Sequence, residues 1–351
     1  MASWFLCLDC GATKTAAAIS DANGKVVGRG WGGPSNITYL TVEQFITSIS
    51  PAIFEAAKAA GLTLDALPPP EPSPFAAAWF GISGADSPSA IAKVAPACSE
   101  LLRIPIGPHL TIGNDAHLLA SPVHLYPVNH VVAVIAGTGS NNISFKLKDG
   151  SIEELGRHGG WGWMLGDEGS GFHVGREAIR QLLTEEDKAS IRGVPSPHSI
   201  LRDRLLERFG VGTVMELLGE VYQADGSPTI EAKGLRGLAR EKRLTSLPPI
   251  VFQTAFEEND WLSISVVTAA ALALADDIAL LFGHGIDGAK KAIPANDTVL
   301  SFGGSLVKNE KYRKLILNRL EEHGLKIPYT HFVEDASVAG ATSLAASFKI
   351  V

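Results

Sequence analysis

The sequence predicts an α/β protein of two lobes that share a cleft between them, and three observations favour this fold class. The chain has 351 residues, which is more than one domain usually holds. Short apolar runs typical of buried strands alternate with segments of helical periodicity. A plan of strand, glycine turn and strand occurs near residues 4–20 and again near 131–150, which indicates a degenerate duplication.

The expected elements of the first lobe follow from the spacing of the apolar residues and from the glycines and prolines that interrupt it. Residues 41–60 have helical spacing, although Pro51 is expected to kink or divide that helix. The proline-rich segment 68–74 reads as a peripheral surface loop whose role the sequence does not reveal. Another helix is expected to begin near Asp115. The expected strands are 4–9, 15–20, a strand beginning at 26–28, 77–82 and 109–112.

The second lobe is expected to begin with a buried strand and to continue mostly as helix. The strand covers 131–135, and a turn-rich hairpin follows around 142–150. We place the first lobe at residues 1–117 plus a C-terminal helix at 336–351, and the second at 118–335 with helical insertions. Its other expected elements are helices at 172–183, 198–209, 214–222 and 261–282, a strand at 298–302, and a helix from about Lys308.

Composition excludes several classes of function. Hydrophobic residues make up 46% of the chain and charged residues 19%, enough for an ordinary apolar core. Thirty Lys and Arg residues against 37 Asp and Glu give a charge of −7, so we expect no nucleic-acid partner. The longest apolar stretch, 262–275, is shorter than the roughly 20 residues that a bilayer requires, so it reads as a buried helix and we expect no membrane partner.

The N-terminal residues and the cysteines favour a cytoplasmic location. The first residues carry no basic segment and reach Asp9 too early for a signal peptide. The cysteines, Cys7, Cys10 and Cys98, are few and odd in number, which suits a reducing compartment. On a strand, Cys7 and Cys10 would point to opposite faces, roughly 10 Å apart, so this C-x-x-C string predicts neither a disulfide nor a zinc site.

The first turn with a chemical signature follows the first strand. Gly11 permits close backbone approach, and Thr13 and Lys14 offer donors to a phosphate. Asp9 could hold a hydrated Mg²⁺ ion, which takes one or two carboxylates together with phosphate oxygens. An ordinary β-turn is the structural alternative, and the spacing is not that of a P-loop.

Two further glycine turns follow later strands. A second turn after 131–135 could clasp the same polyphosphate from the opposite wall of a cleft, and a third after 298–302 favours approach to a nucleoside or its α-phosphate. Simple capping of the next helix by Ser305 is the alternative for the third turn. The residues are Gly137, Thr138 and Gly139 in the second turn, and Gly303, Gly304 and Ser305 in the third.

Asp115 is the candidate catalytic residue. A carboxylate at a strand end and helix start lies on the ligand-binding edge of an α/β sheet, where it can accept a proton from a bound hydroxyl. The alternative is that Asp115 only caps the helix that follows. His158 has no histidine partner at ligand spacing, and we expect it to be hydrogen-bonded structure.

The three turns in this order resemble the phosphate 1, phosphate 2 and adenosine motifs of the sugar kinase, Hsp70 and actin superfamily. The string Gly-Gly-Trp-Gly-Trp-Met-Leu-Gly-Asp-Glu-Gly-Ser-Gly at 159–171 resembles the N-acetylglucosamine kinase branch of the BadF/BadG/BcrA/BcrD ATPase-type family. This resemblance extends over residues 6 to about 344. It implies a ribonuclease H-like two-lobed fold, ATP and Mg²⁺ as cofactors, an amino sugar as substrate, and phosphoryl transfer to its 6-hydroxyl.

The resemblance also implies roles for single residues. Asp115 corresponds to the family's catalytic aspartate, and Thr13 and Thr138 would face the ATP phosphates. Cys10 and Ala12 stand where glycines are common, and the loop 68–74 is extra. Trp163 occupies a variable place. The implied sugar contacts are Asn36, Ser140, Asn141, Gly160, Trp161, Gly162 and Asp167.

Several alternatives stay open from the sequence. Glucosamine or N-acetylmuramic acid could be the preferred sugar. A dehydratase-activator ATPase of the same family would need cysteines for an iron–sulfur cluster, and none follows Cys98. A nucleotide-dependent interaction module would not need a sugar-sized site. Apolar helices of the second lobe could pair two copies into a homodimer.

Overall fold

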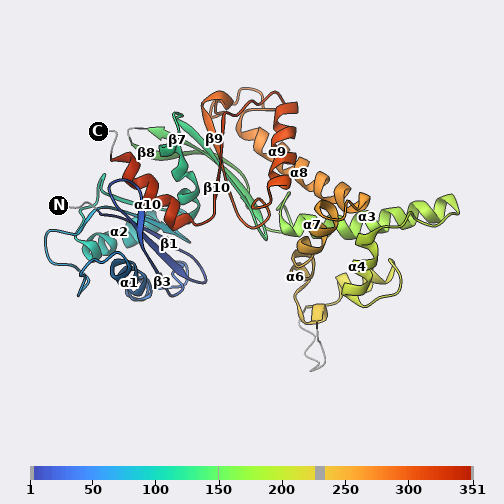
Figure 1. Cartoon of the computed structure of the whole chain (residues 1–351), viewed down its shortest axis with the longest axis horizontal. Coiled ribbons are helices and arrows are strands. Elements are labelled where there is room, and N and C mark those ends of the chain that lie inside the picture. Colours follow the sequence, from blue (N-terminus) through green and yellow to red (C-terminus); the bar gives the residue numbers. More distant parts are fainter. Residues whose placement is uncertain (1–3, 149, 226–233, 349–351) are drawn as a thin grey trace.

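The computed structural model describes residues 4–148, 150–225 and 234–348, and it contains two lobes, each built on a five-stranded sheet (Figure 1). The first sheet has the order β3-β2-β1-β4-β5 and the second the order β10-β9-β6-β7-β8. The strands are β1 (Trp4–Cys10), β2 (Thr15–Ser20), β3 (Val26–Gly32), β4 (Phe75–Ile82), β5 (Leu110–Gly113), β6 (His130–Ala136), β7 (Ser140–Lys148), β8 (Ser151–Gly159), β9 (Thr298–Gly303) and β10 (Tyr329–Val333).

The two sheets have the same topology, as the duplicated sequence plan predicts. In the first sheet, β1 pairs antiparallel with β2 and parallel with β4, and β4 pairs parallel with β5. In the second, β6 pairs antiparallel with β7 and parallel with β9, and β9 pairs parallel with β10. Because the carboxyl ends of parallel strands lie at one edge of a sheet, each lobe gathers three chain turns at a single edge.

Helices cover the faces of both sheets. In Figure 1, α3, α4, α6 and α7 extend beyond the second sheet on the side away from the first lobe. The helices are α1 (Val42–Ala59), α2 (Pro88–Leu102), α3 (Gly171–Arg192), α4 (Ile200–Phe209), α5 (Glu216–Tyr222), α6 (Arg240–Thr245), α7 (Pro248–Phe256), α8 (Trp261–Leu281), α9 (Glu310–Glu322) and α10 (Ala336–Ser347), with 3₁₀ helices η1 (Asp115–Leu125), η2 (Gly234–Gly237) and η3 (Ala295–Asp297).

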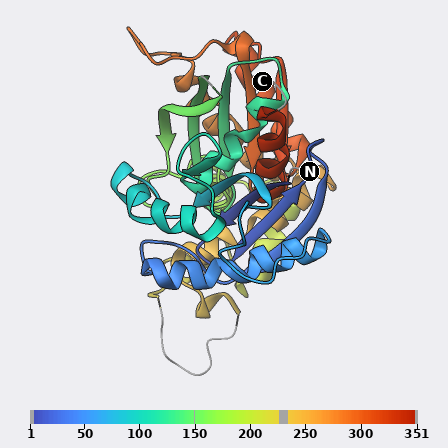
Figure 2. The ribbon, with the colours of Figure 1, turned by 90° about the vertical axis from the view of Figure 1, so that its left-hand side faces the viewer.

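The C-terminal helix α10 returns to the first lobe, where it lies against the blue strands in Figures 1 and 2. Cys7 of β1 packs beneath it, because an added Cβ at Gly340 would lie 2.3 Å from the Cys7 sulfur. Cys10, three residues further along β1, belongs to the core cluster on the other side, together with Cys98. The three cysteines are free and buried, so the strand argument against a Cys7–Cys10 disulfide is confirmed.

Helix α1 packs on β3 through main chain rather than side chains. Added Cβ atoms at Gly28, Gly30 and Gly32 would lie 2.1, 2.2 and 2.6 Å from carbonyl oxygens of Ala56, Ala52 and Ser48 respectively. The glycines are two residues apart on the strand and their partners four apart on the helix. Only glycine therefore allows this close approach of helix and sheet.

The structure corrects three expectations about elements. Pro51 does not divide α1, which runs from Val42 to Ala59, and a kink at Pro51 stays a prediction. The helix at Asp115 is a 3₁₀ helix, with Pro122 inside it. Helix α3 continues to Arg192, past the predicted end at 183, because its last turns are polar and carry no apolar period; Gly193 in the left-handed conformation (φ 69°) ends it. Helices α2, α6 and α7 and strand β10 were not predicted.

Helix α8 is a core helix of the second lobe. It is the one helix among the described residues that is long and apolar enough to cross a membrane by length and composition. Val266, Ala270 and Leu274 are fully buried and belong to the largest core cluster, as expected for the apolar stretch 262–275. The expectation of no membrane partner stays a prediction.

Candidate active site

The carboxyl ends of β1, β4 and β5 bring polar groups together at one edge of the first sheet. Asp9 is paired with Gly81 of β4, and Gly81 is paired with Gly113 of β5. Ser83 follows β4 directly, and Asp115 follows β5 after one residue. The register of the sheet therefore places the turns that carry Asp9, Ser83 and Asp115 side by side.

Asp115 is the first residue of η1 and is held by its own backbone. One of its carboxylate oxygens accepts a hydrogen bond from the Ala116 amide at 2.9 Å, and Asn114 is the residue that caps the helix. Burial raises the pKa of Asp115 above its ordinary value, although hydrogen bonds from Ser83 and Ala116 oppose the rise. A carboxylate with a raised pKa is a better proton acceptor. The Asn114 side-chain oxygen accepts from the same Ala116 amide at 2.9 Å, so both side chains cap η1, and the catalytic role of Asp115 stays a prediction.

Asn36 reaches the same edge through Ser83. Its side-chain amide donates to the Ser83 hydroxyl at 3.4 Å, and its carbonyl oxygen accepts from the Thr38 amide at 2.8 Å. Asn114 in turn donates to Asp86 at 2.7 Å. Sequence reasoning missed Ser83, Asp86 and Asn114. The signal available was the Ser-Gly turn after strand 77–82, which repeats the strand-and-turn plan seen elsewhere.

Asp9 is close enough to two other carboxylates to feel their charge. Its pKa is raised to about 6, first by burial and then by the negative charges of Asp115 and Asp335, while Lys14 lowers it. Asp335 follows β10 of the second sheet, so carboxylates from both lobes lie near the end of β1. The described residues hold no group of three or more metal-binding side chains. A cation held by Asp9 with phosphate oxygens fits this sparse donor set.

The turn after β1 is tight and presents its side chains to solvent. The Gly11 amide donates to the Lys14 carbonyl at 3.0 Å, and an added Cβ at Gly11 would lie 3.1 Å from that oxygen. Thr13 and Lys14 are exposed. The side-chain donors that the sequence assigns to a phosphate are therefore free to reach a ligand.

The second and third glycine turns meet in the second lobe. Gly304 has a φ of 105°, and an added Cβ would lie 2.5 Å from the Ala136 carbonyl oxygen. The Leu306 amide donates to the same oxygen at 3.1 Å. Gly304 is thus the residue that lets the turn after β9 lie directly on the turn after β6.

A cavity of about 420 Å³ opens where these two turns meet. Gly137, Thr138 and Ser305 line it on the polar side, together with Lys308 and Asn309. Its apolar wall comes from α7 and from Leu306, and consists of Pro248, Pro249, Phe252 and Leu306. An apolar slot beside glycine turns suits a planar base whose phosphates lie on the turn amides. The α7 residues were missed because no residue pattern in 248–256 distinguishes a ligand wall from an ordinary helix.

The segment 166–171 ties the second turn to helix α3. Asp167 has a φ of 63° and is buried, and its carboxylate accepts from the Ser140 amide at 3.2 Å. The Ser140 hydroxyl donates to the Glu168 carbonyl at 2.8 Å. An added Cβ at Gly139 would lie 2.9 Å from the Asp167 carboxylate. These contacts join Ser140 and Asp167 to each other, and their roles as sugar contacts stay predictions.

The glycine-rich segment 159–171 carries an exposed aromatic residue, Trp161, that packs on His158. Trp161 is 56% exposed, and its ring meets the ring of His158 edge to face, with centroids 4.9 Å apart. His158 Nε2 lies 3.2 Å from a carboxylate oxygen of Asp277, so His158 is hydrogen-bonded structure as predicted. Gly160 leaves room for Asn141, whose buried side-chain oxygen has no hydrogen-bond partner among the described residues. Gly162 has a φ of 79°.

Two sheets of the same topology, with glycine turns at the ends of their parallel strands, define a two-lobed fold of the sugar kinase and actin type. The chain belongs to the BadF/BadG/BcrA/BcrD ATPase family, whose model matches residues 6–342. Family membership implies the use of ATP.

Relatives and solved structures agree with this assignment. The chain is 27% identical over 272 residues to an N-acetyl-D-glucosamine kinase of Dictyostelium discoideum, covering 78% of this chain and 77% of that protein. It is 27% identical over 268 residues to an N-acetylmuramic acid/N-acetylglucosamine kinase of Clostridium acetobutylicum, covering 75% and 74%.

Two crystal structures show the same fold. One from Porphyromonas gingivalis superimposes with a TM-score of 0.60 at 20% identity, covering 99% of this chain and 100% of that chain. A ROK hexokinase from Thermus thermophilus superimposes with a TM-score of 0.52 at 16% identity, covering 100% of both chains.

Proposed function

We propose that the protein transfers the γ-phosphoryl group of ATP to a hydroxyl of an amino sugar, with N-acetylglucosamine as substrate and its 6-phosphate and ADP as products. One observation carries the proposal: Asp115, with its raised pKa, lies beside the Asn36–Ser83 hydrogen bond and near Asp9 at one sheet edge. The names of the two kinase relatives support the substrate class.

In this proposal each residue of the edge has a distinct task. Asp115 accepts the proton of the attacking sugar hydroxyl, and Asn36 orients the sugar through a hydrogen bond. Amides of the Gly11 and Gly137 turns position the phosphates, so that attack becomes effectively intramolecular. A Mg²⁺ ion bound through Asp9 would offset the charge of the phosphates. Trp161 offers an aromatic face to the sugar ring.

The lobe boundaries, 1–117 with 336–351 and 118–335, and a cytoplasmic location are part of the same proposal. The first sheet lies within residues 4–113, and α10 packs on β1 and β2, which supports these lobes. The buried free cysteines are compatible with a reducing compartment.

The decisive experiment is a coupled ADP-release assay with N-acetylglucosamine, glucosamine, N-acetylmuramic acid, glucose and no sugar. We expect ADP release that depends on sugar and the highest kcat/KM for N-acetylglucosamine, with the product identified as the 6-phosphate by ³¹P NMR. A higher kcat/KM for another amino sugar would change the substrate within the class. ADP release at the same rate without sugar would exclude the kinase and favour an ATPase or a nucleotide-dependent interaction module.

A further inference from the structure

The buried helix α8 contacts the glycine-rich segment 159–171 near both of its ends. Near the second end, an added Cβ at Gly169 would lie 2.3 Å from the Cβ of Leu274, so helix and segment touch closely there. Near the first end, Asp277 lies against His158, the residue that precedes the segment. Asp277 is about one helical turn beyond Leu274. A single core helix therefore supports the segment at both ends.

Asp277 reaches the segment through the imidazole of His158. His158 Nε2 lies 3.2 Å from a carboxylate oxygen of Asp277, and the two side chains are 24% and 21% exposed. Burial raises the pKa of Asp277, and the neighbouring His158 opposes that rise. The imidazole also meets the Trp161 ring edge to face, with centroids 4.9 Å and planes 67° apart. The contacts thus run from the core helix, through His158, to the exposed ring of Trp161.

The backbone around Trp161 does little to fix its ring. Trp161 is 56% exposed and stands between Gly160 and Gly162, which have φ values of 72° and 79°. Glycine has more conformational freedom than any other residue, so ordering this loop is costly. The main chain at Gly166 touches the ring, since an added Cβ there would lie 3.2 Å from Trp161 Cε3. His158 adds a side-chain contact that is anchored in the core of the lobe.

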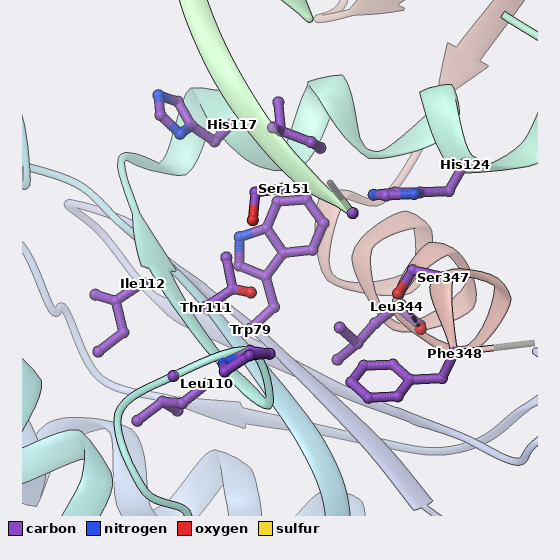
Figure 3. Close-up of a pocket in the computed structure, with 14 residues that line it drawn as sticks. Trp79, Leu110, Thr111, Ile112, His117, His124, Ser151, Leu344, Ser347 and Phe348 are labelled. Carbon is purple, nitrogen blue, oxygen red and sulfur yellow. Dashed lines mark hydrogen bonds between the residues drawn. The ribbon is translucent and has the colours of Figure 1, made fainter. Parts of the chain in front are cut away.

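The chain contains a second histidine pair of the same kind, which shows what is particular about the first. His117 Nε2 lies 3.4 Å from a carboxylate oxygen of Glu154, and the His117 ring meets the Phe145 ring edge to face, with centroids 5.0 Å apart. His117 is among the residues that line the cavity drawn in Figure 3. Phe145 is fully buried, so the core already fixes its ring. At Trp161 the same contact acts on an exposed ring, whose orientation the core does not set.

We propose that His158 and Asp277 are positioning residues for the amino sugar: Asp277 holds His158, and His158 holds the Trp161 ring in a fixed orientation toward the sugar. This inference rests on the proposed function, in which Trp161 offers its face to the sugar ring. A ring that is already oriented loses less conformational entropy when the sugar binds, so the pair should lower the KM for sugar and leave kcat unchanged. Met164 and Leu165, further along the loop, are mostly exposed, so the rest of the loop can still move.

The orientation of the ring is measured by ¹⁹F NMR of the protein labelled with 5-fluorotryptophan. The chain has 6 tryptophans, and the Trp161 resonance is the one that Trp161→Phe removes. In Asp277→Ala this resonance should move toward the shift of free 5-fluorotryptophan. The Trp261 resonance, identified in the same way, should stay in place and show that α8 is still folded. Asp277→Asn keeps an oxygen that can accept from His158, and it should leave the Trp161 resonance in place.

Steady-state kinetics test the consequence for the sugar. Asp277→Ala and His158→Ala should each raise the KM for N-acetylglucosamine about three- to tenfold, with kcat and the KM for ATP changed less than about twofold. Asp277→Asn should keep the unaltered KM. In Trp161→Ala, the addition of Asp277→Ala should raise the KM for sugar by less than about twofold, because the pair acts through a ring that is no longer there.

Two variants control for the loss of a carboxylate. Asp276→Ala removes the neighbouring carboxylate of α8, which contacts Arg319 Nε at 2.9 Å and His323 Nε2 at 2.7 Å. Glu154→Ala breaks the second histidine pair, in which the His117 side chain is 24% exposed, as the His158 side chain is. Both variants should keep the KM for sugar of the unaltered protein.

The possible outcomes separate this proposal from the proposed function. A Trp161 resonance or a KM for sugar that is unchanged in Asp277→Ala would overturn the positioning role. Equal rises of KM in Asp276→Ala and Asp277→Ala would overturn it too, because they would reduce the contact to general support of α8. If the unaltered protein released no ADP in response to any sugar, the proposed function would fail instead, and the ¹⁹F spectra would still decide whether the pair holds the ring.

Discussion

Asp115 is the residue on which the proposed chemistry depends most directly. Asp115→Asn keeps the size of the side chain and its hydrogen bond with the Ala116 amide but removes the proton acceptor. We expect kcat to fall by about 10²- to 10⁴-fold with little change in the KM for sugar. Asp65→Asn, at an exposed position, is the matched control and should retain full activity. Near-normal kcat in Asp115→Asn would exclude the residue as the base.

Asp9 should give the pH profile of the proposed kinase an acid limb near pH 6. Its pKa of about 6 means that half of the free protein lacks the Asp9 charge at that pH. If ionised Asp9 binds the cation, kcat/KM for ATP should fall about tenfold for each pH unit below 6. The pH dependence of stability runs the other way from that of activity. Because the pKa of Asp9 is higher in the folded protein than the usual 3.8, protonated Asp9 favours folding, and this contribution to the free energy of unfolding is lost as pH rises from about 4 through 6.

Asp335→Asn tests the origin of that limb. This change removes one of the negative charges that raise the pKa of Asp9, and it leaves the ion pair of Arg29 with Asp335 without its anion. Both effects lower the pKa of Asp9, so the acid limb of the kcat/KM profile should move to lower pH. Asn also caps helices, so α10 should remain capped, which a thermal unfolding midpoint can check. A limb that stays in place would assign it to another group.

At the scale of residues, the sequence predicted groups that depend on backbone geometry better than groups that depend on neighbours. Gly304 and Gly11 were predicted because close backbone approach selects glycine, and that preference is local. Ser83, Asp86 and Asn114 were missed because each acts through a partner that only the sheet register brings near. The buried environment of Asp167 likewise depends on Ser140 and Gly139, which are far from it in sequence.

At the scale of elements, the turn after β9 gives the sharpest prediction. Gly304→Ala places a Cβ about 2.5 Å from the Ala136 carbonyl oxygen at a φ of 105°. We expect a loss of about 2 to 4 kcal/mol in the free energy of unfolding, together with weaker ATP binding. Gly210 also has a positive φ, but an added Cβ there would meet no atom within 4 Å. Gly210→Ala should therefore lower the free energy of unfolding by only about 1 kcal/mol. Equal losses in urea unfolding would contradict the proposed contact between the turns.

The elements that the sequence predicted share a clear period or a clear end signal. Strands β1, β6 and β9 are apolar runs bounded by glycine turns, and their paired arrangement follows from topology rules. Strand β10 was missed because Thr330 and His331 interrupt its apolar pattern at the edge of the sheet. Pro51 does not divide α1 because a proline in a long, well-packed helix can be tolerated when tertiary contacts outweigh the lost hydrogen bond.

At the scale of the whole molecule, the proposed sugar contacts are divided between the lobes. Asn36 and Asp115 belong to the first, and Asn141 and Trp161 to the second. A sugar that touches both should bind a closed arrangement better than an open one and shift the population toward closure. Small-angle scattering should therefore give a smaller radius of gyration with N-acetylglucosamine than without it.

Trp161→Ala should weaken this contraction, because the second lobe loses part of its sugar platform. Tyr222→Ala, which truncates an exposed aromatic residue on α5, is the control and should contract as the unaltered protein does. Scattering curves that superimpose at saturating sugar would exclude closure driven by the sugar.

The three glycines of β3 that contact α1 should make the first lobe rigid. Two strand residues span about 6.7 Å and four helix residues about 6.0 Å, so Gly28, Gly30 and Gly32 stay in step with successive turns of α1. Main-chain atoms in contact have no rotamers through which to yield. The loop that joins β3 to α1 carries Asn36, and both of its ends are held by this rigid main-chain contact between β3 and α1. The first lobe should therefore change little in shape when the sugar binds. Most of the conformational change should occur in the loop of the second lobe that carries Trp161.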